Sequence, residues 1–132
     1  MKLRFTPNSI RFRMNQTEVA KFAEAGEIRD WIKFPGRTGF RYGLQASKDL
    51  AATEIRFDDG HLTVTIPQAQ ARAWASHEQE VGLYYDQELE GGGTLRIMIE
   101  KDFQCIDGPP EEVDPAGYPN PRAIVGCDVE TK

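Results

Sequence analysis

The chain has 132 residues, 39% hydrophobic and 28% charged, with a formal net charge of −5 and a pI near 5.1. These values are typical of one soluble globular domain; they exclude a wholly disordered or collagen-like chain and argue against binding nucleic acid through its phosphate backbone. The longest uninterrupted apolar runs are about the size of Ile97–Ile99, whereas a membrane-spanning helix needs roughly 20 apolar residues. Lys2 and Arg4 interrupt any apolar secretion signal near the start of the chain. We therefore expect a cytoplasmic protein with no membrane contact.

The first half of the chain is predicted to form two strands, a helix and two further strands. Alternating apolar and polar residues predict strands over 2–6, 9–14, 27–34 and 39–45, and helical spacing predicts a helix over 16–25. Asn15 is suited to cap this helix together with Glu18, and Gly26 is suited to end it.

The second half has the same predicted order. Strands are expected over 53–58, 61–66, 81–88 and 94–100, with a helix over 67–75. Pro67 is expected at the first helical position, where its missing N–H costs nothing. Trp74 is expected to point into the core, as is Phe22 of the first helix.

The two halves also match each other in sequence. The segment KLRFTPNSIRFRM from Lys2 aligns with EIRFDDGHLTVTI from Glu54, with apolar residues at equivalent positions, and further along Arg41 aligns with Arg96. We interpret this match as an ancient duplication within a single domain, 1–132. The pseudo-repeats cover residues 2–46 and 54–100, and an acidic, proline-rich segment follows at 102–132.

The predicted fold class is α+β. Duplicated ββαββ units are expected to form one strongly twisted antiparallel sheet or open barrel, with the two short helices on its apolar face. That face is expected to hold, among others, Leu3, Phe5, Ile10, Phe12, Ile32, Phe34, Phe57, Val64 and Ile99.

The opposite face of the predicted strands is rich in arginine. Its candidate anion-binding residues are Arg4, Arg11, Arg13, Arg41, Arg56 and Arg96. Two interpretations stay open. The face is either an ordinary solvated sheet surface, or a concave surface that binds a phosphorylated or carboxylated ligand through charge-assisted hydrogen bonds. The acidic segment from Asp102 onward is a further candidate to fold back over this face and pair with it.

The element order and the charged face resemble the triphosphate tunnel (CYTH-type) phosphatase family over roughly residues 2 to 100. The resemblance implies a wide barrel of duplicated units with basic residues inside and an activity of phosphoanhydride hydrolysis. The alternating Glu-x-Glu-x-Lys that holds the metal in that family is absent, because the corresponding strands read RFRM and RFDD.

A second resemblance covers most of the chain. The opening KLRFTPNSIRFRMNQTEV, the segment IEKDFQCIDG and the later YPNP are similar to an uncharacterised bacterial domain family of about this length. This resemblance implies membership of a family of unknown function and brings no activity with it.

Other chemical sites have weaker signals. Cys105 and Cys127 are expected to be reduced, Cys105 as a small buried side chain, and His61 and His77 lack the spacing of a zinc site. Glu78 with Glu80 and Glu88 with Glu90 are expected to be solubilising charges near hairpin ends. We therefore expect no catalytic residue, no metal and no cofactor.

The functional hypothesis is a non-catalytic domain that binds a small anionic ligand or an acidic partner through the arginine-rich face. Two alternatives remain: a CYTH-like phosphoanhydride hydrolase, and a plain protein-interaction module whose partner the sequence does not indicate.

Overall fold

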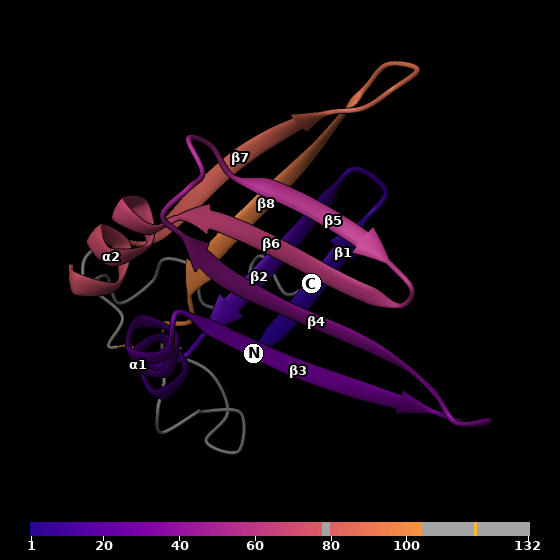
Figure 1. Cartoon of the computed structure of the whole chain (residues 1–132), viewed down its shortest axis with the longest axis horizontal. Coiled ribbons are helices and arrows are strands. Elements are labelled where there is room, and N and C mark those ends of the chain that lie inside the picture. The colour runs from indigo at the N-terminus through magenta and orange to yellow at the C-terminus, as the bar shows by residue number, and fades with distance from the viewer. Residues whose placement is uncertain (78–79, 104–117, 119–132) are drawn as a thin grey trace.

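The computed structural model describes residues 1–77, 80–103 and 118. Within them it contains eight strands and two helices. In chain order they are β1 (Lys2–Thr6), β2 (Ser9–Met14), α1 (Gln16–Ala25), β3 (Glu27–Phe34), β4 (Thr38–Ser47), β5 (Glu54–Asp58), β6 (His61–Pro67), α2 (Gln68–Ser76), β7 (Gly82–Glu88) and β8 (Thr94–Lys101) (Figure 1). The α+β class and the order of elements are those predicted.

The strands form two four-stranded sheets instead of one. Sheet A has the order β1-β2-β8-β7 and sheet B the order β3-β4-β6-β5. The outer pairs of each sheet are antiparallel, but the central pairs β2 with β8 and β4 with β6 are parallel. The prediction of a single antiparallel sheet is therefore wrong, and the described strands form two open mixed sheets that do not close into a barrel.

Each sheet takes two strands from each half of the chain. If each strand of sheet A is replaced by its counterpart in the other half of the chain (β1 by β5, β2 by β6, β8 by β4 and β7 by β3), the order becomes β5-β6-β4-β3. This is the strand order of sheet B read from its other edge. The registers agree as well, because the pair Ser9↔Arg96 in sheet A corresponds to His61↔Arg41 in sheet B. This equivalence is what a duplicated ββαββ unit would leave, and the duplication itself stays a prediction.

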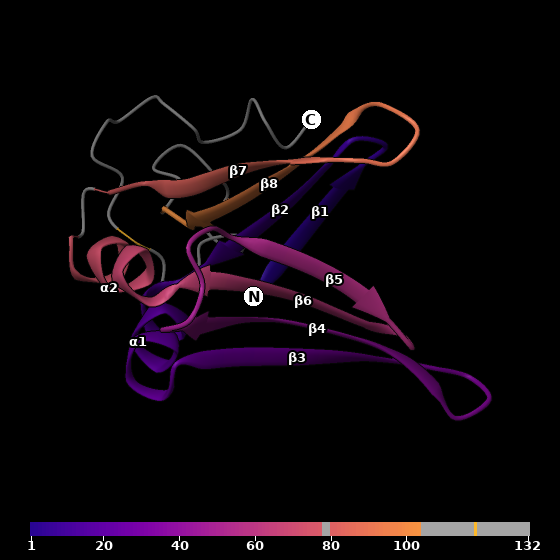
Figure 2. The ribbon, with the colours of Figure 1, turned by 45° about the horizontal axis from the view of Figure 1, so that its top comes forward.

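The helices close one end of the two sheets. Both lie at the end away from the hairpin turns that follow β1, β3 and β7, and they lie against each other (Figures 1 and 2). Helix α1 has the predicted capping box of Asn15 and Glu18, and Gly26 ends it with a φ of 79°. Pro67 differs from the prediction, since it ends β6 and stands one position before α2 begins.

The inner faces of the two sheets pack into one core near the helices. Phe12 and Ile99 of sheet A and Val64 of sheet B are buried together with Phe22 and Trp74 of the helices. Away from the helices the sheets diverge (Figure 2), and residues of the same apolar face become exposed. Five residues expected on the apolar core face are exposed at the surface: Phe5, Ile32, Phe34, Phe57 and Val81.

A buried charge at the end of β8 was not predicted. The side chain of Lys101 is almost fully buried, and its Nζ donates to the carbonyl of His77. Nζ also lies 5.6 Å from the ring centroid of Trp74 and 5.5 Å from that of Tyr118. Such cation–π contacts compensate part of the cost of burying an ammonium group.

Neither described helix is long and apolar enough to cross a bilayer.

Candidate functional site: two arginine-bearing sheet surfaces

The six candidate arginines lie on two surfaces. Successive side chains of a strand alternate between faces, so the inward positions of Phe12 and Val64 fix the arginines on the outer faces. Arg4, Arg11, Arg13 and Arg96 lie on the outer face of sheet A, whereas Arg41 and Arg56 lie on the outer face of sheet B. The expectation that all six share one face is wrong, because it rested on a single sheet.

On sheet A, three of the four arginines are paired with carboxylates of the chain itself. Arg11 Nε lies 3.3 Å from Glu100, Arg13 Nη2 lies 3.6 Å from Asp102, and Arg96 Nη1 lies 3.3 Å from Asp86. The side chains of Arg11 and Arg13 are only 20% exposed. A ligand anion on this surface would have to compete with pairs that are already formed.

Asp102 begins the acidic segment that was expected to fold back on the arginines. Its carboxylate lies 2.8 Å from Lys2 Nζ as well as near Arg13, and its backbone carbonyl accepts from the N–H of Tyr118 at 2.9 Å. Asp102 directly follows β8, so this pairing belongs to the end of the strand, and the folding back of the later segment stays a prediction. The further acidic residues Asp107, Glu111, Glu112 and Asp114 lie outside the described part of the chain.

Tyr84 belongs to the same surface. Its hydroxyl donates to Glu100 Oε2 at 2.9 Å, and Arg96 lies 5.4 Å from its ring centroid. Burial of the hydroxyl, followed by the hydrogen bond to Glu100, raises the pKa of Tyr84 from its ordinary value of 10.0 to about 12. Glu100 thus forms an ion pair with Arg11 and accepts a hydrogen bond from Tyr84.

On sheet B, the outer face carries arginines with few carboxylate partners. Arg41 lies with its guanidinium carbon 4.3 Å from the ring centroid of Trp31, and its Nη1 is 3.4 Å from His61 Nε2. His61 Nδ1 is 3.1 Å from the carbonyl of Asp59. Because a carbonyl only accepts, Nδ1 carries the proton and Nε2 accepts from Arg41. Arg41 is thereby oriented by the Trp31 ring and the His61 imidazole, and no carboxylate of the described residues lies within ion-pair distance of it.

A hollow of about 660 Å³ lies beside this group, lined by Arg29, Asp30, Trp31, Arg41, His61 and Thr63. In the row of residues across sheet B, Gly43 stands between Arg29 and Thr63. The Arg29 side chain lies over this glycine, since a Cβ on Gly43 would lie 2.6 Å from Arg29 Cγ. Arg29 donates to Gln45 at 2.9 Å and to Thr63 at 3.4 Å, and lies 3.5 Å from Glu27.

Arg56 extends the same surface to the edge strand β5. It pairs in register with Thr63 and is exposed, and the described residues place no carboxylate within ion-pair distance of it. Asp58 pairs in register with His61 on the same face, while the Asp30 carboxylate lies 3.2 Å from the Met1 amino nitrogen. We call Arg29, Arg41, Arg56, His61, Thr63 and Trp31 the sheet B surface.

Sequence reasoning placed Trp31 and Arg29 on the arginine-rich face but did not select them. The signal was the spacing of Arg29, Trp31 and Lys33 along one strand, which puts all three on one side. The sequence alone did not show which residue of the neighbouring strand the Trp31 indole packs against. A Cβ on Gly39 would lie 1.9 Å from the indole Nε1, so the indole lies directly over this glycine.

The remaining candidates do not form a site. His77 ends α2, and its Nδ1 lies 2.7 Å from the carbonyl of Ala73. Among the residues that the structure describes, no three His, Cys, Asp or Glu side chains are placed to hold a metal ion. Cys105, Cys127 and Glu78 lie outside those residues.

A family model described as "Family of unknown function (DUF7009)" matches residues 1–122. The chain belongs to this family. The match confirms the resemblance to an uncharacterised domain family and covers every strand and helix that the structure describes in this DUF7009 chain. No curated protein and no solved structure matches it. The likeness to the triphosphate tunnel fold therefore has no structural support, and the described sheets enclose no tunnel.

Proposed function

We propose that the chain is a binding domain for an anionic group, a small phosphorylated ligand or the acidic group of a partner, held on the sheet B surface. The observation that carries the proposal is the difference between the two outer faces. Arg11, Arg13 and Arg96 of sheet A lie against carboxylates of the chain. In contrast, Arg41 is oriented by Trp31 and His61, and Arg56 is exposed.

The chemistry of this surface suits an oxyanion. Guanidinium groups donate to phosphate and carboxylate oxygens in a bidentate manner, and such charge-assisted bonds are about twice as strong as neutral ones. Thr63 adds a hydroxyl beside Arg29. Trp31, whose side chain is 48% exposed, gathers basic groups on this surface, because Arg41 and Lys33 lie 4.3 Å and 5.0 Å from its ring centroid.

The role of Arg4, Arg11, Arg13 and Arg96 changes under this proposal. The pairs of Arg11 with Glu100 and of Arg13 with Asp102 hold the outer face of sheet A together with the segment after β8. We assign these arginines to structure and Arg41 and Arg56 to ligand binding. A metal-dependent hydrolase receives no support from the described carboxylates, since those on sheet A are engaged with arginine.

Thermal shift measurements at low salt test the proposal with tripolyphosphate, nucleotides and sulfate, each with and without magnesium. At about 100 times its dissociation constant, a ligand adds roughly 2.7 kcal/mol to the free energy of unfolding. The shift should disappear in Arg41→Gln/Arg56→Gln and weaken as salt screens the charges.

Two further variants separate the surfaces. Arg72→Gln removes a charge from the exposed side of α2 and should keep the full shift. Arg11→Gln/Arg13→Gln alters sheet A and should also keep the ligand-induced shift, although the unliganded protein loses stability. A shift that vanishes in this second variant and survives in Arg41→Gln/Arg56→Gln would contradict the assignment to sheet B.

A further inference from the structure

The end of the molecule away from the helices exposes a continuous apolar surface. Five large apolar side chains of the inner sheet faces lie there with about half or more of their surface exposed: Phe5 at 55%, Ile32 at 46%, Phe34 at 52%, Phe57 at 67% and Leu89 at 47%. We call this region the open end. Exposed apolar patches of this kind mark interaction sites in proteins.

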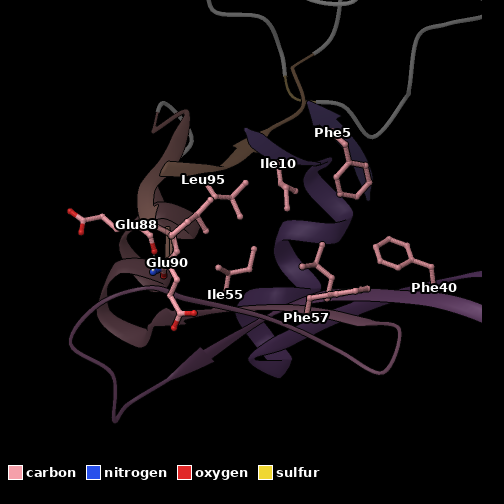
Figure 3. Close-up of a pocket in the computed structure, with 11 residues that line it drawn as sticks. Phe5, Ile10, Phe40, Ile55, Phe57, Glu88, Glu90 and Leu95 are labelled. Carbon is pink, nitrogen blue, oxygen red and sulfur yellow. Dashed lines mark hydrogen bonds between the residues drawn. The ribbon is translucent and has the colours of Figure 1, made fainter. Parts of the chain in front are cut away.

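The two sheets form a cleft at the open end. The cleft has a volume of about 940 Å³, and its walls include Phe5 and Ile10 from sheet A and Phe40, Ile55 and Phe57 from sheet B (Figure 3). Phe40 joins the two sides, with ring centroids 6.1 Å from Phe5 and 6.3 Å from Phe57. No basic side chain lines this cleft among the described residues.

Two hairpins of opposite charge flank the open end. The β3–β4 hairpin carries Lys33 and Arg37, and the β7–β8 hairpin carries Glu88 and Glu90, all exposed. Both hairpins lie at the end away from the helices and diverge toward opposite corners of it (Figures 1 and 2). Their registers correspond, so that Lys33 and Glu88 occupy equivalent positions next to Phe34 and Leu89.

This arrangement is complementary to a second copy of itself. A two-fold axis across the open end brings the basic hairpin of one copy against the acidic hairpin of the other, twice, and brings the apolar surfaces together between them. A ligand confined to the cleft would leave Ile32 and Phe34 exposed, because neither lines it. A second copy of the chain that covers the whole open end would bury both residues.

We propose that the open end is the interface of a two-fold homodimer, with an apolar centre formed around Phe5 and Phe57 and charge pairs of Glu88 and Glu90 with Lys33 and Arg37 of the second copy. This site faces away from the sheet B surface and meets it only at Lys33, whose Nζ lies 5.0 Å from the ring centroid of Trp31, and the proposal does not rest on anion binding. Opposite charges at a rim of this kind mainly select the partner and its orientation.

Sedimentation equilibrium of the full chain tests the proposal through charge reversal. The wild type should be dimeric in the micromolar range. Glu88→Lys/Glu90→Lys gives the two flanking hairpins four positive charges at these positions, and Lys33→Glu/Arg37→Glu gives them four negative ones. Each variant alone should dissociate with a constant raised about tenfold or more, and an equimolar mixture of the two should recover the dimer mass.

Lys21→Glu and Glu24→Lys, on exposed positions of α1, are the matched controls and should leave the dimer unchanged. Circular dichroism checks that every variant is folded. A monomeric wild type, a dimer indifferent to both sets of reversals, or a mixture that stays monomeric would each overturn the proposal. A monomer that binds Nile red in the cleft would overturn it in favour of a small apolar ligand.

Discussion

Phe22 of α1 and Trp74 of α2 meet edge to face, with ring centroids 6.3 Å apart and planes at 63°. The two residues occupy equivalent places in the two halves of the chain, and both are almost fully buried. The indole N–H of Trp74 also donates to the carbonyl of Val81 at 3.2 Å. The contact therefore joins both helices to the start of β7 at the closed end of the core.

Truncation of this pair should be among the most costly substitutions in the chain. Trp74→Ala removes a buried ring and its hydrogen bond, and we expect a loss of about 3 to 5 kcal/mol in the free energy of unfolding, measured by urea denaturation. Trp31→Ala is the matched control, because its ring is half exposed on sheet B. Equal losses for the two tryptophans would contradict the packing described.

The chain should unfold as one cooperative unit. Strand β2 pairs with β8 and β4 with β6, so neither half can complete a sheet without the other. We expect a single thermal transition, with equal calorimetric and van't Hoff enthalpies. Two separate transitions would show that the halves are independent domains.

The contact of Trp31 with Gly39 predicts a coupled pair of substitutions. Gly39→Ala places a Cβ where the indole lies, so the ring must move away from Arg41 and stability should fall. In a Trp31→Ala background the same change should cost much less, because the obstructing ring is gone. A double-mutant cycle measured by denaturation checks this coupling, and additive effects would contradict the placement of the indole.

Tyr84 predicts a pH dependence at the alkaline end. Its pKa is about 12 in the folded chain and 10.0 when unperturbed, so the fold favours the neutral phenol. The stabilisation is complete below pH 10 and is lost as the pH rises toward 12. Tyr84→Phe should abolish this component of the alkaline loss, which chemical denaturation at several pH values measures. An unchanged profile would show that the fold does not raise the pKa of Tyr84.

Local patterns in the sequence were sufficient for the elements but not for their partners. Alternation and capping residues such as Asn15 predicted the strands and α1 closely, since these signals lie within a few residues of each other. The parallel pairing of β2 with β8 is a contact between distant segments, and no local signal specifies it. The division of the arginines between two surfaces follows from that pairing.

The open end illustrates the same limit. Phe5 and Phe12 have the same place in the alternation of their hairpin, yet Phe12 is buried and Phe5 is exposed. The difference comes from the divergence of the two sheets with distance from the helices. Periodicity assigns a residue to a face, whereas its burial depends on what lies opposite.

The most direct test of anion binding is a two-dimensional NMR titration of the 15N-labelled chain with tripolyphosphate at low salt. Our account predicts saturable shifts of the backbone amides around Arg41, His61 and Thr63 and of the Trp31 indole N–H, all lost in Arg41→Gln/Arg56→Gln and retained in Arg72→Gln. Shifts confined to the β2 and β8 amides of sheet A, or no saturable shift at all, would contradict the assignment of the anion site to sheet B.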